Sequence, residues 1–369
     1  MSKAPKTIEE KYAHLLLDYC LELKEGSSLL INTSTEAQPL LREVYKLAVS
    51  RGAMVEVSLD FPEKQELFYK YASQKALEKP PEFASLAMRE FDNLLTIRAP
   101  YNLRATSGLD SKKMATRQKA LKSINESYFK RTASGEMKRA LCEYPTQASA
   151  QNAGVSLQSW REFVFDACRL YDEDPIASWL QVRKDQQKIV DHLNKCSEIH
   201  YKGPNIDMKF STKGRIWINS DGTANMPSGE VFTAPVEDEV NGYARFSYPA
   251  IYRGEEVEGV ELWVEKGEVV KWDAVRGKDY LDKIFEIPGA KRFGEVAIGT
   301  NYRIQKMSRS ILFDEKIGGT IHMAIGQSYI QTGGKNESTV HWDMITDMKT
   351  DSEITADGEI IYKNGKFTL

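Results

Sequence analysis

The sequence of 369 residues lacks several features that would assign a function class at once. It contains only four cysteines, and no two of them form a Cys-x-x-Cys pair, so neither a zinc finger nor a disulfide framework is indicated. We expect reduced thiols in a cytoplasmic protein. No apolar run has transmembrane length, and the N-terminus shows no small-residue cleavage site of a secretory signal.

Nucleotide-binding loops and a strong charge of either sign are also missing. No Gly-x-Gly-x-x-Gly follows the first strand-like segment, and no P-loop motif occurs anywhere in the chain. The net charge at pH 7 is −3. This near balance favours neither nucleic acid nor a membrane surface as a partner.

Helical and strand-like patterns alternate in the first part of the chain. Apolar residues have helical spacing in 7–24 and 36–50, whereas 27–34, 53–61 and 91–98 are strand-like. This alternation predicts an α/β domain with a mostly parallel sheet and helices on both faces.

The pattern changes near residue 200, after two helical segments. Strand-like segments separated by turns rich in Gly, Asp and Asn then continue to the C-terminus. They predict an α+β domain with a curved, mainly antiparallel sheet. We therefore divide the chain into an α/β domain over residues 1–199, a scaffold and possible dimer surface, and a catalytic domain over residues 200–369 that carries a candidate metal site.

Histidine is scarce, and its positions are informative. The chain has five histidines, and two of them lie between Gly294 and Met344, with carboxylates around and before them. The candidate metal ligands are Glu230, Glu295, Glu315, His322, His341 and Asp343. Imidazole and carboxylate groups gathered in this way are typical of divalent metal sites, and the flanking glycines allow close backbone approach.

Each of these residues also allows a simpler interpretation. His341 and Asp343 share one face of a strand, which suits one metal ion, but they could equally be a polar pair on an exposed face. His322 lies between apolar neighbours and could be a core histidine. Glu295 and Glu230 stand in short apolar segments and need a buried partner, which could be a Lys or Arg.

Glu315 lies in a loop ahead of His322, where a glutamate is usually a surface residue.

The charges of the candidate ligands match two divalent ions. Four carboxylates carry about −4 and two divalent ions about +4. A bridging hydroxide would leave the site at about −1, which a substrate ammonium balances. Three ligands per ion leave room for water and substrate, and Zn, Co and Mn all suit such ligands. Tyr329 is a candidate oxyanion donor, or an aromatic residue that packs at a strand end.

Five blocks resemble, in this order, the family of thermophilic aminopeptidases T and S: YPTQASAQNAGVSLQSWREFVFDA, NMPSGEVFTAP, RFGEVAIG, ILFDEKIGGTIHMAIGQSY and NESTVHWDM. The resemblance covers residues 140–369 well. The first 140 residues match the family in their general pattern more than in particular motifs. It implies a cytoplasmic metallo-aminopeptidase, usually a homodimer, that binds two divalent ions and releases N-terminal residues from peptides with a free N-terminus.

The resemblance places the metal ligands on the six residues named above and the active-site tyrosine on Tyr329. We expect a metal-activated water to attack the scissile carbonyl, Tyr329 to stabilise the oxyanion, and Glu230 or Glu295 to relay a proton to the leaving amine. The catalytic candidates are therefore Tyr329 and Glu295.

The chain departs from the founding members in two spacings. Glu315 and His322 lie further apart, so the resemblance supports Glu315 least. The connection from His322 to His341 is shorter, which leaves the substrate pocket and the specificity open. Two other functions also remain: a dinuclear hydrolase of a non-peptide amide or ester, and a non-enzymatic α/β binding protein with a vestigial site.

Overall fold

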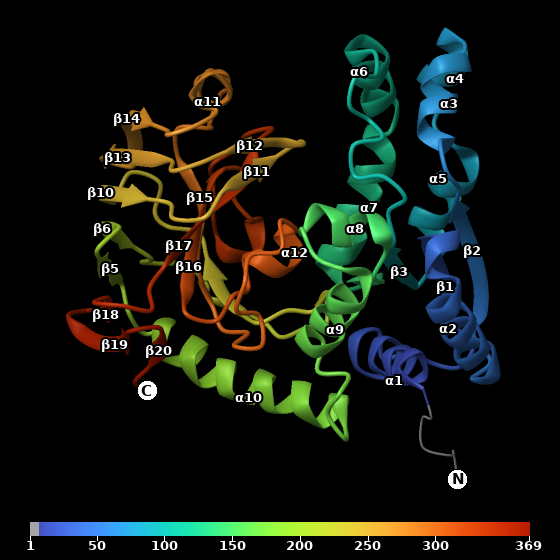
Figure 1. Cartoon of the computed structure of the whole chain (residues 1–369), viewed down its shortest axis with the longest axis horizontal. Helices are drawn as coiled ribbons and strands as arrows, with labels where there is room; N and C mark the ends of the chain where they lie inside the picture. The colour runs from blue at the N-terminus through green and yellow to red at the C-terminus, as the bar shows by residue number, and fades with distance from the viewer. Residues whose placement is uncertain (1–6) are drawn as a thin grey trace. The chain divides into compact units, whose positions relative to one another are not determined.

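A computed structural model of the chain describes residues 7–369, which form two compact units (Figure 1). The first comprises the described residues up to Ile176 together with Gly222–Met226, and the second comprises Ala177–Asp221 and Pro227–Leu369. The division at residue 199 into independent domains stays a prediction. We expected no secretory signal at the N-terminus. Residues 1–6 of that segment lie outside the described residues.

The first unit is built on a five-stranded, wholly parallel sheet in the order β2-β1-β3-β4-β8. The central strands β1 and β3 are mostly buried, as expected for a parallel sheet covered on both faces, whereas the edge strand β2 is largely exposed. The strands are β1 (Ser28–Ser34), β2 (Met54–Asp60), β3 (Asn93–Arg98), β4 (Lys138–Glu143) and β8 (Asn225–Met226).

Helices connect these strands, as the alternating sequence pattern predicted. Thr7 begins the first helix with a capping box that it forms with Glu10. Helices α3, α4, α6 and α7 extend beyond the sheet (Figure 1), with α4 against α6. The helices are α1 (Ile8–His14), which continues as a π-helix (Leu15–Cys20), a 3-10 turn (Thr35–Ala37), α2 (Gln38–Ser50), α3 (Lys64–Tyr71), α4 (Gln74–Glu78), α5 (Glu82–Glu90), α6 (Ser111–Ala120), α7 (Lys122–Ser134), α8 (Gln147–Asn152) and α9 (Leu157–Ala167).

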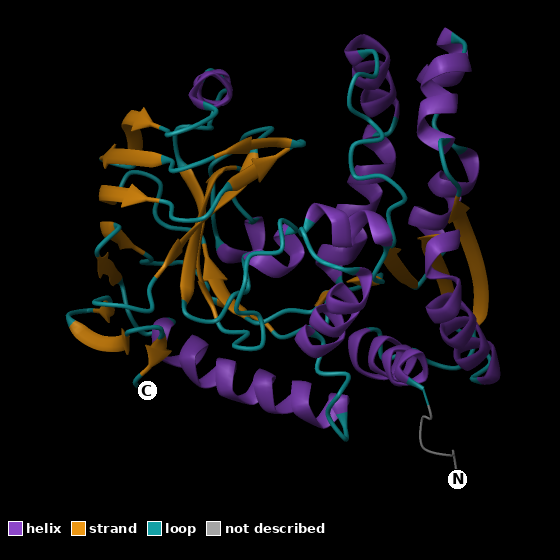
Figure 2. Cartoon of the chain, in the orientation of Figure 1, coloured by secondary structure: helices purple, strands orange, loops and turns teal. Residues whose placement is uncertain are grey.

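The second unit consists mainly of antiparallel strands, and Figure 2 shows this contrast with the helix-rich first unit. An eight-stranded sheet has the order β14-β13-β10-β6-β5-β18-β19-β20. Its strands are β5 (Glu198–Gly203), β6 (Ile206–Ser211), β10 (Val240–Arg245), β13 (Glu261–Glu265), β14 (Glu268–Asp273), β18 (Glu353–Ala356), β19 (Glu359–Lys363) and β20 (Lys366–Phe367).

A five-stranded sheet with the order β17-β16-β15-β9-β7 carries the candidate ligands. Its strands are β7 (Ile218–Ser220), β9 (Glu230–Thr233), β15 (Phe293–Gly299), β16 (Thr320–Gly326) and β17 (His341–Asp347), and a separate hairpin pairs β11 (Ala250–Tyr252) with β12 (Glu255–Val257). The helices are α10 (Pro175–Leu193), α11 (Lys278–Phe285), α12 (Ile311–Asp314) and a 3-10 turn (Ile330–Thr332).

One hydrophobic core joins the two large sheets of the second unit. Side chains from both sheets enter it, among them Phe210, Leu262, Phe293 and Trp342, all buried. Each sheet thus has one apolar face, which the alternation of its strands supplies. The predicted fold class, a parallel α/β part followed by an antiparallel part, is confirmed, and the antiparallel strands divide between two sheets and a hairpin. None of the helices formed by residues 7–369 combines the length and apolar character of a membrane span.

Candidate metal centre

The five-stranded sheet turns one face to the core and collects functional side chains on the other. The residues on either side of His322 in β16 enter the core, so His322 points the opposite way. In β17, Trp342 enters the core and leaves His341 and Asp343 together on the ligand face. A core histidine and an exposed polar pair were the simpler interpretations, but these three side chains face one another instead.

A bulge turns Glu295 onto the same face. The pairing of β15 with β16 shifts register between Phe293 and Glu295. Phe293 and Val296 consequently both enter the core, although they are three residues apart, and Glu295 lies on the ligand face. A bulge is a common device for directing one side chain out of a regular strand.

Small residues separate the functional groups on this face. Ala324 pairs with Glu295 on one neighbouring strand and with Asp343 on the other. Ala297 pairs with His322 in the same way. Because alanine fills little volume, the space above the sheet is left to the carboxylates and imidazoles.

Glu295 lies between the two histidines. Its Oε1 atom is 3.5 Å from His322 Nε2, and its Oε2 atom is 3.2 Å from His341 Nε2. Asp343 Oδ1 lies 3.7 Å from His341 Nε2, and Glu230 Oε2 lies 3.6 Å from His322 Nε2. Glu230, Glu295 and His322 are buried, so these groups interact in a poorly solvated place.

A lysine that the sequence analysis did not identify completes the cluster. Lys316 is fully buried, and its Nζ atom contacts the Glu315 carboxylate and lies 3.4 Å from Glu230 Oε1. Glu315 ends the short helix α12 and retains some exposure. In sequence, Glu315 and Lys316 look like a solvated loop pair, so only the fold reveals that the ammonium points inward. The simpler partner expected for Glu230, a Lys, is therefore present beside the histidine.

His341 and Tyr329 are held next to each other. The backbone carbonyl of Gln327 lies 2.8 Å from His341 Nδ1, so this nitrogen donates and Nε2 is free to act as a ligand. The rings of Tyr329 and His341 have centroids 5.0 Å apart, and Phe232 contacts the other side of Tyr329. All seven predicted site residues therefore gather in one place.

The electrostatics of the cluster favour bound positive charge. Burial alone would lower the pKa of both imidazoles, but the surrounding carboxylates raise the pKa of His322 and of His341. Burial raises the pKa of Glu230 against the opposing effect of Lys316. Burial would also raise the pKa of Glu295, yet the two imidazoles hold it below its usual value. The carboxylates of the cluster therefore stabilise positive charge, whether it is on an imidazole or on a bound ion.

The cluster contains two overlapping groups of side chains that could hold a metal ion. One group of possible ligand atoms comes from Glu295, His341 and Asp343, and a second comes from Glu315, His322 and Asp343. Within each group all atoms lie within 4.8 Å of one another. Glu230 Oε2, a buried atom without a hydrogen-bond partner among the described residues, lies beside the second group. Nitrogen and carboxylate donors of this kind suit Zn, Co or Mn.

The segment before Glu230 needs glycine at position 229, which gives a first prediction. Gly229 has φ +118°, and a Cβ atom there would lie 2.7 Å from Asn301 Cβ. Gly229→Ala should lower the free energy of unfolding by about 2 kcal/mol or more, through backbone strain and this clash. Gly254→Ala is the matched control, because Gly254 has φ +87° but an added Cβ would meet nothing within 4 Å. Urea unfolding checks this, and equal losses in the two variants would contradict it.

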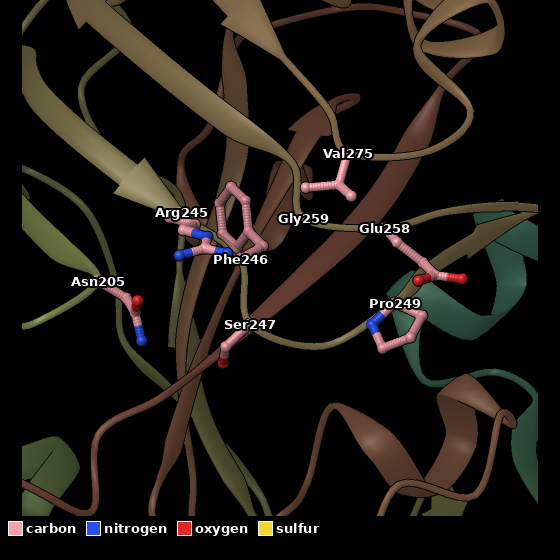
Figure 3. A pocket seen from close by; sticks show the side chains of 8 residues that line it. All are labelled: Asn205, Arg245, Phe246, Ser247, Pro249, Glu258, Gly259 and Val275. Carbon is pink, nitrogen blue, oxygen red and sulfur yellow. The ribbon is translucent and has the colours of Figure 1, made fainter.

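A cavity of about 380 Å³ lies elsewhere on the second unit (Figure 3). Arg245 and Asn205 stand on one side of it and Glu258 on the other, with the Phe246 ring between them (Figure 3). None of the candidate metal ligands lines it. The acidic cluster and this cavity are therefore separate features.

Comparisons with known proteins agree on one family. Residues 6–367 match the family described as thermophilic metalloprotease (M29). The chain is 29% identical to aminopeptidase 2 of Geobacillus stearothermophilus, covering 98% of this chain and 97% of that protein.

Solved structures extend the likeness to the fold. The structure of AmpT from Thermus thermophilus matches with a TM-score of 0.84 and 25% identity, over 98% of this chain and 99% of that one. A 2,5-dihydroxypyridine dioxygenase from Pseudomonas putida matches with a TM-score of 0.61 at 15% identity, over 99% of both chains, which concerns the fold alone. The family resemblance predicted from sequence is thus confirmed, and the chain belongs to the thermophilic metalloprotease family M29.

Proposed function

We propose that this protein is a metal-dependent aminopeptidase that holds two divalent ions, Zn, Co or Mn, and releases N-terminal residues from peptides. The observation that carries the proposal is the position of Glu295, whose two oxygens face the Nε2 atoms of His322 and His341 at 3.5 and 3.2 Å. A carboxylate with one oxygen toward each imidazole would help to hold an ion at either histidine. The names of the relatives, aminopeptidase 2 and AmpT, support the substrate class.

The six ligands would divide between two positions. Glu295, His341 and Asp343 would hold one ion, and Glu315, His322 and Asp343 the other, with Glu230 beside the second. Asp343 belongs to both groups, and Glu295, a member of the first, also has one oxygen 3.5 Å from His322 Nε2. When bound, the two ions polarise the scissile carbonyl and lower the pKa of a water so that it can attack.

The side chains of this chain would then supply the remaining steps. Partial desolvation of the hydroxyl and the neighbouring carboxylates raise the pKa of the Tyr329 phenol above its usual value, although the residue as a whole is 42% exposed. The phenol therefore stays protonated at neutral pH and can donate a hydrogen bond to a developing oxyanion. Glu230 or Glu295 would carry a proton from the attacking water to the leaving amine.

Location and assembly belong to the same proposal. We infer a cytoplasmic enzyme, since all four cysteines are free thiols and three of them are buried. We also infer a homodimer, from the resemblance to the family. Peptides with a free N-terminus are the expected partners, with no nucleic acid and no membrane.

A comparison of two synthetic substrates tests the substrate class. An amino-acid p-nitroanilide should be hydrolysed by the metal-loaded enzyme, and its N-acetylated form should not, because an aminopeptidase requires the free α-amine. Metal analysis of the same preparation should give about two ions per chain. Equal hydrolysis of both substrates would favour a dinuclear hydrolase of non-peptide amides or esters. Absence of both metal and hydrolysis would favour a binding protein with a vestigial site.

Tyr329→Phe tests the tyrosine separately from the metal. The substitution removes the hydroxyl but keeps the ring, which packs between Phe232 and His341. We expect kcat to fall by about 10²-fold, with metal content and thermal stability unchanged. Steady-state kinetics and metal analysis measure both quantities. An unchanged kcat would remove Tyr329 from the mechanism and leave it a packing residue.

A further inference from the structure

Lys316 is a buried cation inside an acidic cluster. A lysine ordinarily keeps its ammonium in water, but the Lys316 side chain is 0% exposed. Its Nζ atom contacts Glu315 and lies 3.4 Å from Glu230 Oε1. A lysine is ordinarily charged at neutral pH, and the two carboxylates supply the partners that a buried ammonium requires.

The backbone around Lys316 holds this ammonium in place. The Lys316 amide donates to the Phe313 carbonyl at 3.1 Å, and the Lys316 carbonyl accepts from Asn301 N at 3.0 Å. Asn301 in turn accepts from Gly318 N at 3.0 Å and donates through Nδ2 to Ser228 O at 2.9 Å. Ile317, the next residue, is fully buried. These bonds fix the backbone from which the Lys316 side chain enters the cluster.

The contacts of Lys316 are confined to one side of the cluster. Glu315 belongs to the ligand group of His322, and Glu230 lies beside that same histidine. Within the described residues, Lys316 forms no ion pair with Glu295 or Asp343, the carboxylates that pair with His341. The ion pairs of Lys316 thus place a buried positive charge beside the His322 group, next to Glu315 and Glu230.

This charge opposes a divalent ion in two ways. The ammonium occupies Glu230 Oε1 and the Glu315 carboxylate, two of the oxygens that an ion at His322 would use. It also repels a second cation at short range, and repulsion between charges is strong where water is excluded. If an ion displaced the ammonium from both carboxylates, a buried charge would lose its partners, which is costly.

We propose that Lys316 makes the two metal positions unequal, so that the position at His322 binds a divalent ion more weakly and exchanges it faster than the position at His341. This inference rests on the proposed dinuclear site. Lys316 also changes the charge count made from the sequence. With its ammonium included, two ions and a bridging hydroxide leave the site near neutral, so no surplus charge remains for a substrate amine.

Titration of the metal-free enzyme with Co²⁺ tests the proposal. Calorimetry on the wild type should resolve two binding steps whose Kd values differ by about tenfold or more. In Lys316→Met, which keeps the length and removes the charge, the weaker step should tighten by about tenfold or more, while the stronger step stays unchanged. Lys316→Arg retains the charge and should keep the two steps unequal.

Two further measurements make the result decisive. Lys209→Met, at an exposed position of β6, is the control for loss of a surface charge and should reproduce the wild-type titration. Exchange of the wild-type Co²⁺ enzyme against Zn²⁺, followed by visible absorption, should show one fast and one slow ion, whether or not the Met variant folds.

The outcomes separate this inference from the proposed function. Two equal steps in the wild type would overturn the inequality and leave the dinuclear site intact. A weaker step that stays the same or weakens further in Lys316→Met would overturn the role of Lys316. A wild type that binds no Co²⁺ would overturn the proposed function itself, and this inference with it.

Discussion

Glu295→Gln is expected to abolish metal binding and peptidase activity while the fold persists. The wild-type carboxylate presents one negatively charged oxygen to each histidine. An amide of the same shape offers one neutral oxygen and one NH₂ group, which repels a cation. Loss of a shared ligand weakens both metal positions, so kcat/KM should fall by about 10³-fold or more, or about 4 kcal/mol in transition-state stabilisation.

Three measurements check this expectation. Metal analysis should give less than one ion per chain, peptide hydrolysis should be near background, and circular dichroism should show an unchanged fold. Glu268→Gln, on exposed β14, is the matched control and should behave as the wild type. Full metal content with full activity in Glu295→Gln would show that Glu295 is a structural partner of the two histidines and nothing more.

The sequence could predict the ligand face because each ligand strand alternates cleanly. In β16 and β17, every second residue enters one apolar core, so the facing of His322, His341 and Asp343 follows from their positions. Alternation likewise predicts that Glu295 faces away from Val296 and Ile298. The bulge between Phe293 and Glu295, which no pattern in the sequence indicates, is what allows Phe293 to enter the core as well.

Lys316 shows why the rest could not be predicted. A Glu-Lys pair in a loop is ordinarily solvated, and the sequence carries no sign that this lysine is 0% exposed. Its burial depends on the backbone link from Asn301 to residues 316–318, which joins segments that are distant in sequence from β9. Contacts of that kind come from the fold and not from local propensity.

The first unit illustrates the same limit at the level of strands. The parallel arrangement followed from alternating helices and strands, but β4 begins with two basic residues, Lys138 and Arg139, and was not identified as a strand. β8 is only Asn225–Met226, and it joins a sheet otherwise built from residues before 144. A pairing between such distant segments leaves no periodic pattern in the sequence.

The fold by itself does not select the reaction. A dioxygenase at 15% identity has a TM-score of 0.61 with this chain, so a shared architecture is compatible with a different chemistry. The assignment therefore depends on the family match and on the side chains that the second unit brings together. Tests that change those side chains, or their ions, are the ones that bear on function.

Removal of metal by a chelator is expected to abolish activity reversibly and to destabilise the second unit. An ion that binds the folded site but not the unfolded chain adds stability that grows with its free concentration, about 2.7 kcal/mol at a hundred times Kd. The metal-free protein should therefore unfold about 5–10 °C lower. Zn, Co or Mn should restore both activity and the original unfolding temperature.

Glu295→Gln provides the control for this measurement as well. If the ions act through the cluster, this variant should unfold at the same temperature with and without chelator, because it holds little metal to lose. A chelator-dependent shift of equal size in the variant would place the stabilising ion elsewhere in the chain. Full activity in a preparation shown to contain no metal would contradict the proposed mechanism, in which bound ions would activate the water and polarise the carbonyl.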